Sequence, residues 1–232
     1  MADVGCGGLG ALPALAALVG EEGLAVGIDV SAPSLAQARA ILDGRGIGNV
    51  HLIRANIDEV APADVCPPGP FDAVFCRLFL IHQPDPAATL RRMASLVRPG
   101  GHVITHELLH APRLPRSQPE VPELDAVMDI CAETMRRGGA SPEAPRRMRA
   151  HCEQAGLTVV SQRGFLNVDI DAGFAIRGFG DLLSSLRPRA VALGVVAESE
   201  VESLLGRLRT AEQRAYESIF GVIFVETVAR VA

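Results

Sequence analysis

The chain has 232 residues, a length that suits one α/β domain with an inserted or appended helical part. Its formal net charge is −5 and no lysine-rich run occurs, which disfavours nucleic acid as the main partner because phosphate recognition needs a basic face. Five scattered cysteines without a C-x-x-C pair, no run of eighteen apolar residues and no recognisable signal peptide predict a cytoplasmic protein with no metal site and no membrane span.

The stretch Asp3–Gly10 (DVGCGGLG) combines an apolar strand end, a glycine turn and the start of a helix predicted at Ala11–Val19. Glycines let the backbone turn sharply and approach a ligand closely, and the helix behind them offers unpaired N–H groups. The apolar run Leu24–Asp29 predicts the second strand. Because Asp29 lies nineteen residues past Gly10, the stretch also meets the G-x-G-x-x-G dinucleotide fingerprint. Two cofactors, of the NAD type and S-adenosylmethionine (SAM), therefore compete for this site.

Asp3 separates these two cofactors. A buried, unpaired carboxylate is unfavourable, so Asp3 should face a cation or hydrogen-bond donors. The ammonium group of a methionine-type ligand is such a cation, and NAD brings none to this strand end. Asp29 lies at the carboxyl end of its strand, where a carboxylate can accept hydrogen bonds from ribose hydroxyls. We therefore expect Asp3 and Asp29 to hold opposite ends of one ligand.

Strands and helices go on alternating along the first half of the chain, which implies a parallel sheet with right-handed crossovers. Asp85 and Pro86 have the residue types of a helix cap and a first helical position. The pattern predicts a helix at Ser34–Leu42, strands at Val50–Arg54, Phe71–Cys76 and His102–Thr105, and a helix that begins at Pro86.

Two motifs resemble those of one enzyme family. Asp-Val-Gly-Cys-Gly at 3–7 is similar to motif I of class I SAM-dependent methyltransferases, and Arg-Pro-Gly-Gly at 98–101 before an apolar strand is another hallmark of that family. The resemblance covers Met1 to about Glu107, and it departs from the family at Leu9, which stands where the family has its third glycine. It implies a doubly wound, Rossmann-like α/β sheet of seven strands, parallel with a final antiparallel strand, and SAM as the cofactor.

The resemblance also implies a set of cofactor-binding residues. Asn56 stands where the family usually has an acid for the adenine amino group, although a turn capped locally by Asn56 is an equal alternative. Ile57 would lie against the adenine ring, and the backbone at Arg77 and Leu78 would touch the methionine end. The full predicted set is Asp3, Gly5, Cys6, Gly7, Asp29, Val30, Asn56, Ile57, Arg77 and Leu78.

Candidate catalytic residues are His106, Glu107 and His82, near the ends of the fourth and fifth strands. Most of the catalysis in this family comes from alignment of the reactants, and a base matters when the acceptor is a hydroxyl or an ammonium. For each histidine, a structural polar role at a strand end is the alternative. A metal site at His106, Glu107 and His110 is disfavoured because Pro112 interrupts the helix that such spacing needs.

Beyond residue 107 a proline-rich linker leads into helices predicted at Leu124–Met135, Ser141–Ala155, Ala172–Leu186 and Glu198–Ser218, with strands at Leu157–Phe165 and Phe220–Val231. We expect three parts. Residues 1–107 form the SAM-binding core, residues 108–156 form a helical cap insertion, and residues 157–232 complete the sheet and the substrate side.

The sequence thus predicts a SAM-dependent methyltransferase that acts on O, N or C of a small-molecule metabolite. An NAD(P)-binding oxidoreductase and a non-catalytic or truncated SAM-binding protein are the alternatives. The second alternative arises because only Met1–Val4 precede the glycine turn, whereas family members usually carry a further N-terminal helical segment over the cofactor. A chain without that cover is compatible with a homodimer.

Overall fold

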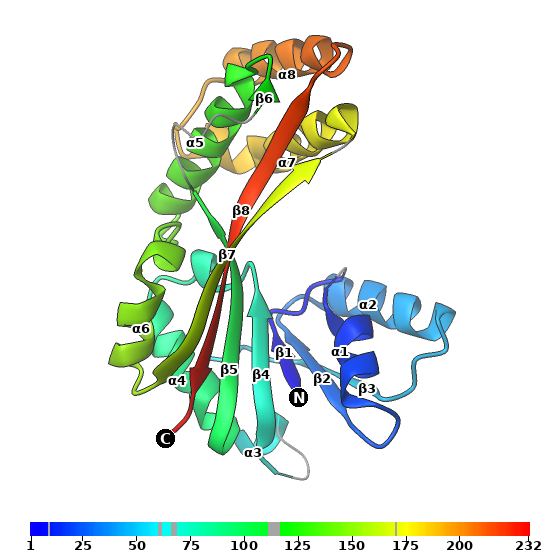
Figure 1. The fold of residues 1–232 in the computed structure, drawn as a ribbon, viewed down its shortest axis with the longest axis vertical. Coiled ribbons are helices and arrows are strands. Elements are labelled where there is room, and N and C mark those ends of the chain that lie inside the picture. Colours follow the sequence, from blue (N-terminus) through cyan, green and yellow to red (C-terminus); the bar gives the residue numbers. More distant parts are fainter. Residues whose placement is uncertain (9, 60–61, 66–68, 111–116, 170) are drawn as a thin grey trace. The chain divides into compact units, whose positions relative to one another are not determined.

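The computed structural model describes residues 1–232 except 9, 60–61, 66–68, 111–116 and 170. The chain forms two compact units (Figure 1). The first combines Met1–Glu107, Ala144–Arg163 and Val225–Ala232, and the second combines Leu108–Glu143 and Gly164–Phe224. Leu9, part of the loop at 67–70 and most of the proline-rich linker lie outside the described residues.

Parallel strands form the centre of the first unit. They follow the order β3 (Val50–Arg54), β2 (Ala25–Asp29), β1 (Ala2–Val4), β4 (Phe71–Arg77) and β5 (Val97–Leu109). Each neighbouring pair runs parallel, with Val4 opposite Ile28 and Arg77 opposite His106. Parallel strands in register end at the same edge of the sheet, so the loops after β1, β2, β3 and β4 all emerge there.

The sheet continues past β5 through β8 (Ser218–Arg230) to β6 (Ser117–Gln118), and β7 (Thr158–Asp169) pairs with β8. β6 and β8 are antiparallel. The predicted class, an α/β fold with a mostly parallel sheet and a late antiparallel strand, is confirmed. Among the described residues the sheet has eight strands, and the two-residue β6 is the one that the pattern did not predict.

Helices cover both faces of the sheet in the first unit (Figure 1). α1 (Leu12–Val19) and α2 (Ala32–Gly44) pack in one cluster with Ala25 and Val50. Val26 and Ile28 point the other way, into the cluster of α3 (Pro62–Val65), α4 (Pro86–Ser95) and α6 (Met148–Gln154). β2 is therefore buried on both sides, which explains its nearly continuous apolar sequence.

Two side chains cap the starts of helices, and the cap predicted at Asp85 is one of them. Ser31 Oγ accepts a hydrogen bond from the Ser34 N–H at the start of α2. Asp85 Oδ1 accepts one from the Ala88 N–H at the start of α4, at 2.9 Å. Each side-chain oxygen satisfies an N–H group that the first helical turn leaves unpaired.

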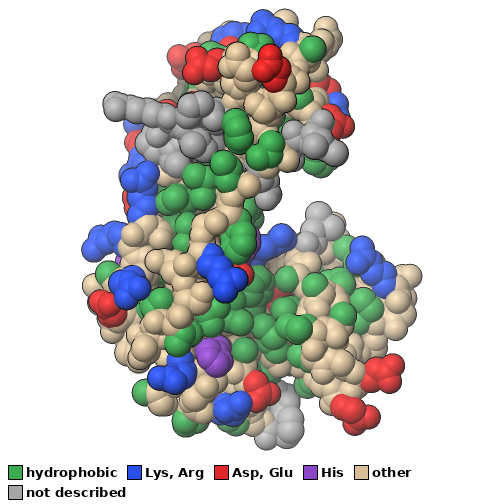
Figure 2. Space-filling view, viewed as in Figure 1, with side chains coloured by type: hydrophobic (Ala, Val, Ile, Leu, Met, Phe, Trp, Pro, Cys, Tyr) green, Lys and Arg blue, Asp and Glu red, His purple; other side chains and the backbone are tan. Residues whose placement is uncertain are grey.

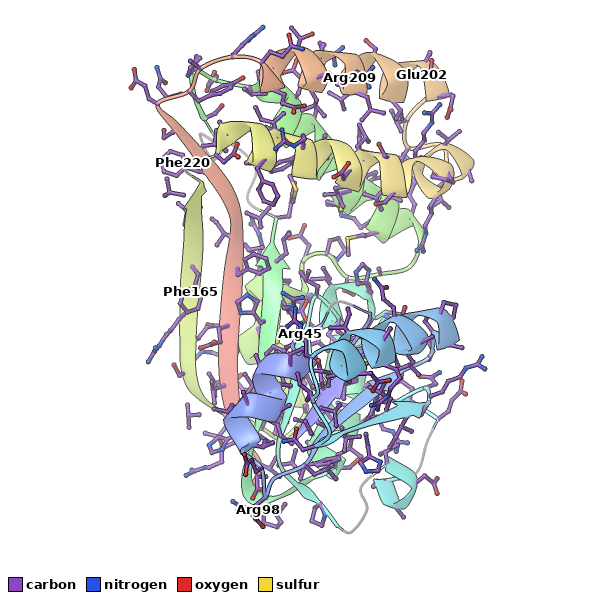
Figure 3. All side chains as sticks on the ribbon, turned by 90° about the vertical axis from the view of Figure 1, so that its right-hand side faces the viewer. Arg45, Arg98, Phe165, Glu202, Arg209 and Phe220 are labelled. Atoms are coloured by element: carbon purple, nitrogen blue, oxygen red, sulfur yellow. The ribbon has the colours of Figure 1, made fainter. Side chains whose placement is uncertain are left out.

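The second unit is built around α5 (Pro122–Arg137), α7 (Ala172–Ala192) and α8 (Glu198–Glu212). Their apolar faces share one core, which includes Leu124, Val127, Ile176, Leu183, Val201 and Leu204. The opposite face of α8 is polar, and it carries Glu202 and Arg209 (Figure 3). Whether residues 108–156 act as a substrate cap stays a prediction.

Several predicted boundaries differ from the structure, and α7, for example, runs to Ala192 rather than Leu186. α8 ends at Glu212 rather than Ser218, because Ser218 and Ile219 pair with β6. The helix predicted at Ser141–Ala155 is divided into the 3₁₀ turn η2 (Ala144–Arg147) and α6, and Pro145, which lacks an N–H, lies in that turn. β5 extends to Leu109, so His106 and Glu107 belong to the strand.

The surface is mixed in charge. On the face shown in Figure 2, basic and acidic side chains are interspersed over both units. Arg98, near the start of β5, donates from Nε to Asp72 Oδ1 at 2.7 Å (Figure 3). Within the described part of the chain, no helix has both the length and the apolarity needed to cross a membrane.

The core of the first unit allows a stability test. Leu90 of α4 is fully buried, whereas Leu18 of α1 is 73% exposed. We expect Leu90→Ala to lower the free energy of unfolding by about 2–5 kcal/mol, because the truncation leaves a cavity. Leu18→Ala should change it by less than about 0.5 kcal/mol. Urea unfolding of both variants measures the difference, and equal effects would contradict the described packing.

Candidate functional site

The glycine turn after β1 is tied to the end of β2. The backbone N–H groups of Gly5 and Cys6 both donate to Ile28 O, at 2.8 and 3.2 Å. Gly7 N donates to Asp29 Oδ2 at 2.9 Å, and the other carboxylate oxygen accepts from Ser31 N at 2.8 Å. Gly5 and Gly7 have φ values of +69° and +59°, a backbone region that favours glycine.

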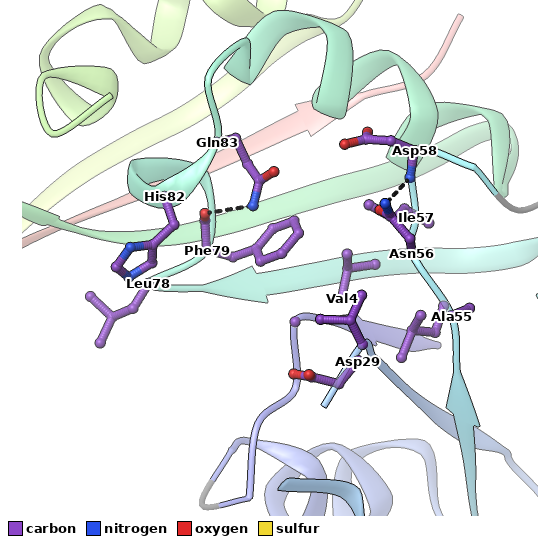
Figure 4. A pocket seen from close by; sticks show the side chains of 13 residues that line it. Val4, Asp29, Ala55, Asn56, Ile57, Asp58, Leu78, Phe79, His82 and Gln83 are labelled. Atoms are coloured by element: carbon purple, nitrogen blue, oxygen red, sulfur yellow. Dashed lines mark hydrogen bonds between the residues drawn. The ribbon is translucent and has the colours of Figure 1, made fainter. Parts of the chain in front are cut away.

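A cavity of about 440 Å³ opens at the edge where the parallel strands end (Figure 4). Every segment that lines it follows or ends a strand of the first unit. The segments come from β1, β2, β3 and β4. The lining residues are Val4, Gly5, Ile28, Asp29, Val30, Ala55, Asn56, Ile57, Asp58, Leu78, Phe79, His82 and Gln83.

The loop after β4 forms one wall of this cavity. Leu78 has φ +53°, the one positive value at a non-glycine residue in the described chain. The loop then enters the 3₁₀ turn η1 (Leu80–His82). Gln83 Nε2 donates to Phe79 O at 3.3 Å (Figure 4). A Cβ at Gly5 would collide with the Phe79 ring, so glycine is required there for the close approach as well as for its φ.

Glu107 lies behind that wall. Its side chain is fully buried, and Oε1 accepts hydrogen bonds from the N–H groups of Phe79 and Leu80 at 3.1 and 2.9 Å. Oε2 accepts from Ile81 N at 3.4 Å. Burial raises the pKa of the Glu107 carboxyl to about 7, and the three N–H groups oppose the rise. Glu107 thus touches the loop backbone, and its predicted role as a base has no support from this geometry.

Asp3 is also buried, with 2% of its surface exposed, and it is not among the residues that line the cavity in the described chain. Its carboxyl lies against the start of α1. Burial raises its pKa to about 7, while the Arg77 guanidinium and the Ala11 N–H oppose the rise. The Arg77 charge and the Ala11 N–H are groups of the protein that offset part of the effect of burial on Asp3. Contact between Asp3 and a ligand stays a prediction.

The predicted cofactor residues divide into two groups. Six line the cavity, and they are Gly5, Asp29, Val30, Asn56, Ile57 and Leu78. Four others, Asp3, Cys6, Gly7 and Arg77, do not, although Gly7 holds the Asp29 carboxylate. The local-cap alternative for Asn56 also holds, because its Oδ1 accepts from Asp58 N at 3.1 Å (Figure 4).

Among the three candidate catalytic residues, His82 lines the cavity and the other two do not. His106 is half-buried on β5. Burial lowers its pKa, Glu226 raises it and Arg77 lowers it further. His110 binds Asp129 Oδ1 through Nε2 at 3.0 Å in the second unit. In the described part of the chain no group of three or more potential metal ligands occurs.

Sequence reasoning missed several lining residues. The missed residues are Val4, Ile28, Ala55, Asp58, Phe79 and Gln83. Val4 ends β1 and Ile28 precedes the last residue of β2, so the rule that placed Asp29 could have found them. Phe79 and Gln83 carry no comparable signal, because their position depends on how the loop after β4 folds back.

Comparisons with known proteins agree on one family. A family described as a methyltransferase domain matches residues 1–156. The ubiquinone biosynthesis O-methyltransferase of Serratia proteamaculans is 41% identical over 102 residues, which cover 44% of this chain and 39% of that protein. The protein of the same name from Bordetella bronchiseptica is 33% identical over 168 residues, which cover 70% of this chain and 63% of that protein.

The fold has solved counterparts. The crystal structure of a Bacillus halodurans protein assigned as a methyltransferase superposes with a TM-score of 0.61 at 17% identity, covering 99% of this chain and 90% of that one. This likeness concerns the fold. The chain spans between 39% and 63% of the lengths of the two curated relatives described above.

The Gly5 position gives a stability prediction. Gly5→Ala combines a left-handed backbone with a collision against the Phe79 ring, whereas Gly7→Ala has the backbone strain with no atom of the described residues within 4 Å of its Cβ. We expect Gly7→Ala to cost about 1–2 kcal/mol. Gly5→Ala should cost about 1–3 kcal/mol more because of overpacking. Chemical denaturation checks the difference, and a double variant with Phe79→Ala should remove most of the extra loss.

The Asp3 carboxyl gives a pH prediction. Its pKa is about 7 in the fold and about 3.9 in an unfolded chain. Between these values the folded form holds a proton that the unfolded form has lost, so the Asp3 contribution to stability falls as the pH rises. We expect Asp3→Asn, which mimics the protonated acid, to gain stability relative to the native chain from about pH 4 to about pH 7 and then level off.

Urea unfolding across this pH range measures the difference between the two proteins. Asp43→Asn is the control, because Asp43 is exposed in a surface ion pair with Arg39. A stability difference between Asp3→Asn and the native chain that stays constant or shrinks as the pH rises would show that Asp3 is not held in its protonated form.

Proposed function

This chain belongs to a family of methyltransferase domains, and we propose that it transfers a methyl group from SAM to a small-molecule acceptor. The observation that carries the proposal is the cavity at the ends of β1, β2, β3 and β4. It lies where the strand order reverses between β1 and β4, the place at which open α/β sheets bind their ligands.

The lining of the cavity fits an adenosyl ligand. Each Asp29 oxygen accepts one backbone N–H, which leaves further lone pairs for the two hydroxyls of a ribose. Ile28 and Ile57 supply apolar surface for a flat base, and Asn56 supplies a polar side chain beside it. A volume of about 440 Å³ falls within the range of about 300–1,000 Å³ typical of small-molecule sites.

Methyl transfer from SAM requires the protein mainly to position the reactants. Bound SAM supplies a methyl group that its sulfonium already activates. The residues of the chain then bind and orient the two reactants and exclude water from them, and this positioning accounts for most of the rate enhancement. His82 is the predicted catalytic residue that lines the cavity, so we propose it as the group that accepts a proton from the acceptor.

The acceptor that we propose is a hydroxyl group of a small molecule. The support is that both curated relatives described above carry the name O-methyltransferase. Methyl transfer to a hydroxyl releases a proton, and a base such as His82 would accept it. The family and the relatives described above carry the names of methyltransferases, so they give no support to the alternative of an NAD(P)-dependent oxidoreductase.

We also propose a reducing, cytoplasmic setting. Cys6, Cys76 and Cys152 are buried and free, and burial raises the pKa of each thiol. Uncharged, buried thiols suit a compartment in which disulfides do not form. A homodimer stays a prediction.

The Asp29 carboxylate provides the test of the proposed function. Asp29→Asn removes a charged acceptor, so we expect S-adenosylhomocysteine to bind about 10–100-fold more weakly in calorimetry. Asp43→Asn, an acid-to-amide change on the exposed face of α2, should leave the affinity unchanged. Unchanged affinity in Asp29→Asn would exclude the ribose contact. A native chain that binds NADH and not S-adenosylhomocysteine would overturn the proposed function.

A further inference from the structure

One buried carboxylate serves three consecutive backbone N–H groups. Glu107 is fully buried on β5, and its two oxygens accept from the N–H groups of Phe79, Leu80 and Ile81. Cys76 Sγ lies 3.7 Å from Oε1 and donates to it as well. A carboxyl group has two oxygens with several lone pairs, so it can accept from several donors at once. The hydrogen bonds of the Glu107 carboxylate are therefore made mainly to the backbone of the loop after β4.

The loop needs such an acceptor. Leu78 is in a left-handed conformation that a side chain makes unfavourable by about 1–2 kcal/mol. The first N–H groups of η1 have no partners within their own turn, and burial without partners would be unfavourable. Glu107 supplies the partners from a strand 26 to 28 residues further along the chain.

The opposite side of the same loop faces the cavity. Leu78, Phe79, His82 and Gln83 form one wall of the cavity. The Phe79 ring packs closely over the Gly5 α-carbon, at the turn that begins the cofactor site. A change in the backbone of residues 79–81 therefore moves the ring and the imidazole that the wall presents.

We propose that Glu107 is a positioning residue, whose buried carboxylate fixes the backbone of residues 79–81 and thereby holds Phe79 and His82 at the cofactor cavity. Glu107 itself does not touch the cavity. The claim that Glu107 holds the loop backbone depends on the hydrogen-bond geometry alone. The claim that this affects cofactor binding rests on the proposed function.

Two substitutions separate positioning from base catalysis. Glu107→Leu removes every acceptor at similar size. Glu107→Gln keeps one carbonyl oxygen, which can still accept from Phe79 and Leu80, so it should rescue part of the loss. Thr105→Val is the matched control, because Thr105 is buried on the same strand and its Oγ1 has no hydrogen-bond partner among the described residues.

The first measurement is amide hydrogen exchange in peptides that cover residues 78–83. We expect exchange to be at least about 10-fold faster in Glu107→Leu and less so in Glu107→Gln, with peptides from β2 unchanged. Thr105→Val should match the native chain. Equal exchange in all four proteins would overturn the proposal, as would faster exchange that is uniform along the chain.

The second measurement is the affinity for S-adenosylhomocysteine. We expect Glu107→Leu to weaken binding about 10-fold and Glu107→Gln about 3-fold, in the order of their exchange rates. If Glu107 acted only as a base, its substitution would change neither the affinity nor the exchange rate. Faster exchange in Glu107→Leu with an unchanged affinity would therefore overturn the positioning role. If the native chain does not bind the probe, the proposed function fails, while hydrogen exchange still decides whether Glu107 holds the loop.

Discussion

The parallel register of β1 between β2 and β4 is the constraint on which the site depends. Val4 lies opposite Ile28, and Asp3 lies opposite Phe75, so the first glycine turn and the loop after β4 leave the sheet side by side. Without that register the Asp29 carboxylate and the Phe79 ring would not meet at one cavity. The cavity therefore follows from strand order first and from individual side chains second.

Three carboxylates near this edge have different surroundings and therefore different tasks. Asp29 lines the cavity and keeps free lone pairs beside its two backbone donors. Asp3 and Glu107 are buried, and burial raises the pKa of each to about 7. Their hydrogen-bond partners are the start of α1 and the loop after β4, and neither acid is among the described residues that line the cavity. Residue type alone does not separate a ligand-binding acid from a loop-holding acid.

Much of the first unit could be predicted from local patterns. The strands at Val50–Arg54 and Phe71–Arg77 and the cap at Asp85 follow from apolar runs and from residues with strong positional preferences. The predictions failed where a distant segment decides the outcome. The chain after Glu212 leaves the helix because Ile219 pairs with Ser117, a partner about a hundred residues away that helical periodicity cannot reveal.

The sequence by itself determined the class of fold and the acid at the cavity, because Asp29 occupies a strand end and strand ends of a parallel sheet share one edge. Tertiary structure alone decided the directions of Asp3 and Glu107. The Arg77 charge opposes the rise of the Asp3 pKa, and the N–H groups of Phe79 and Leu80 donate to Glu107, although these residues lie far from the two acids along the chain. The energy of a buried charge depends on such neighbours in space, and spacing along the sequence does not specify them.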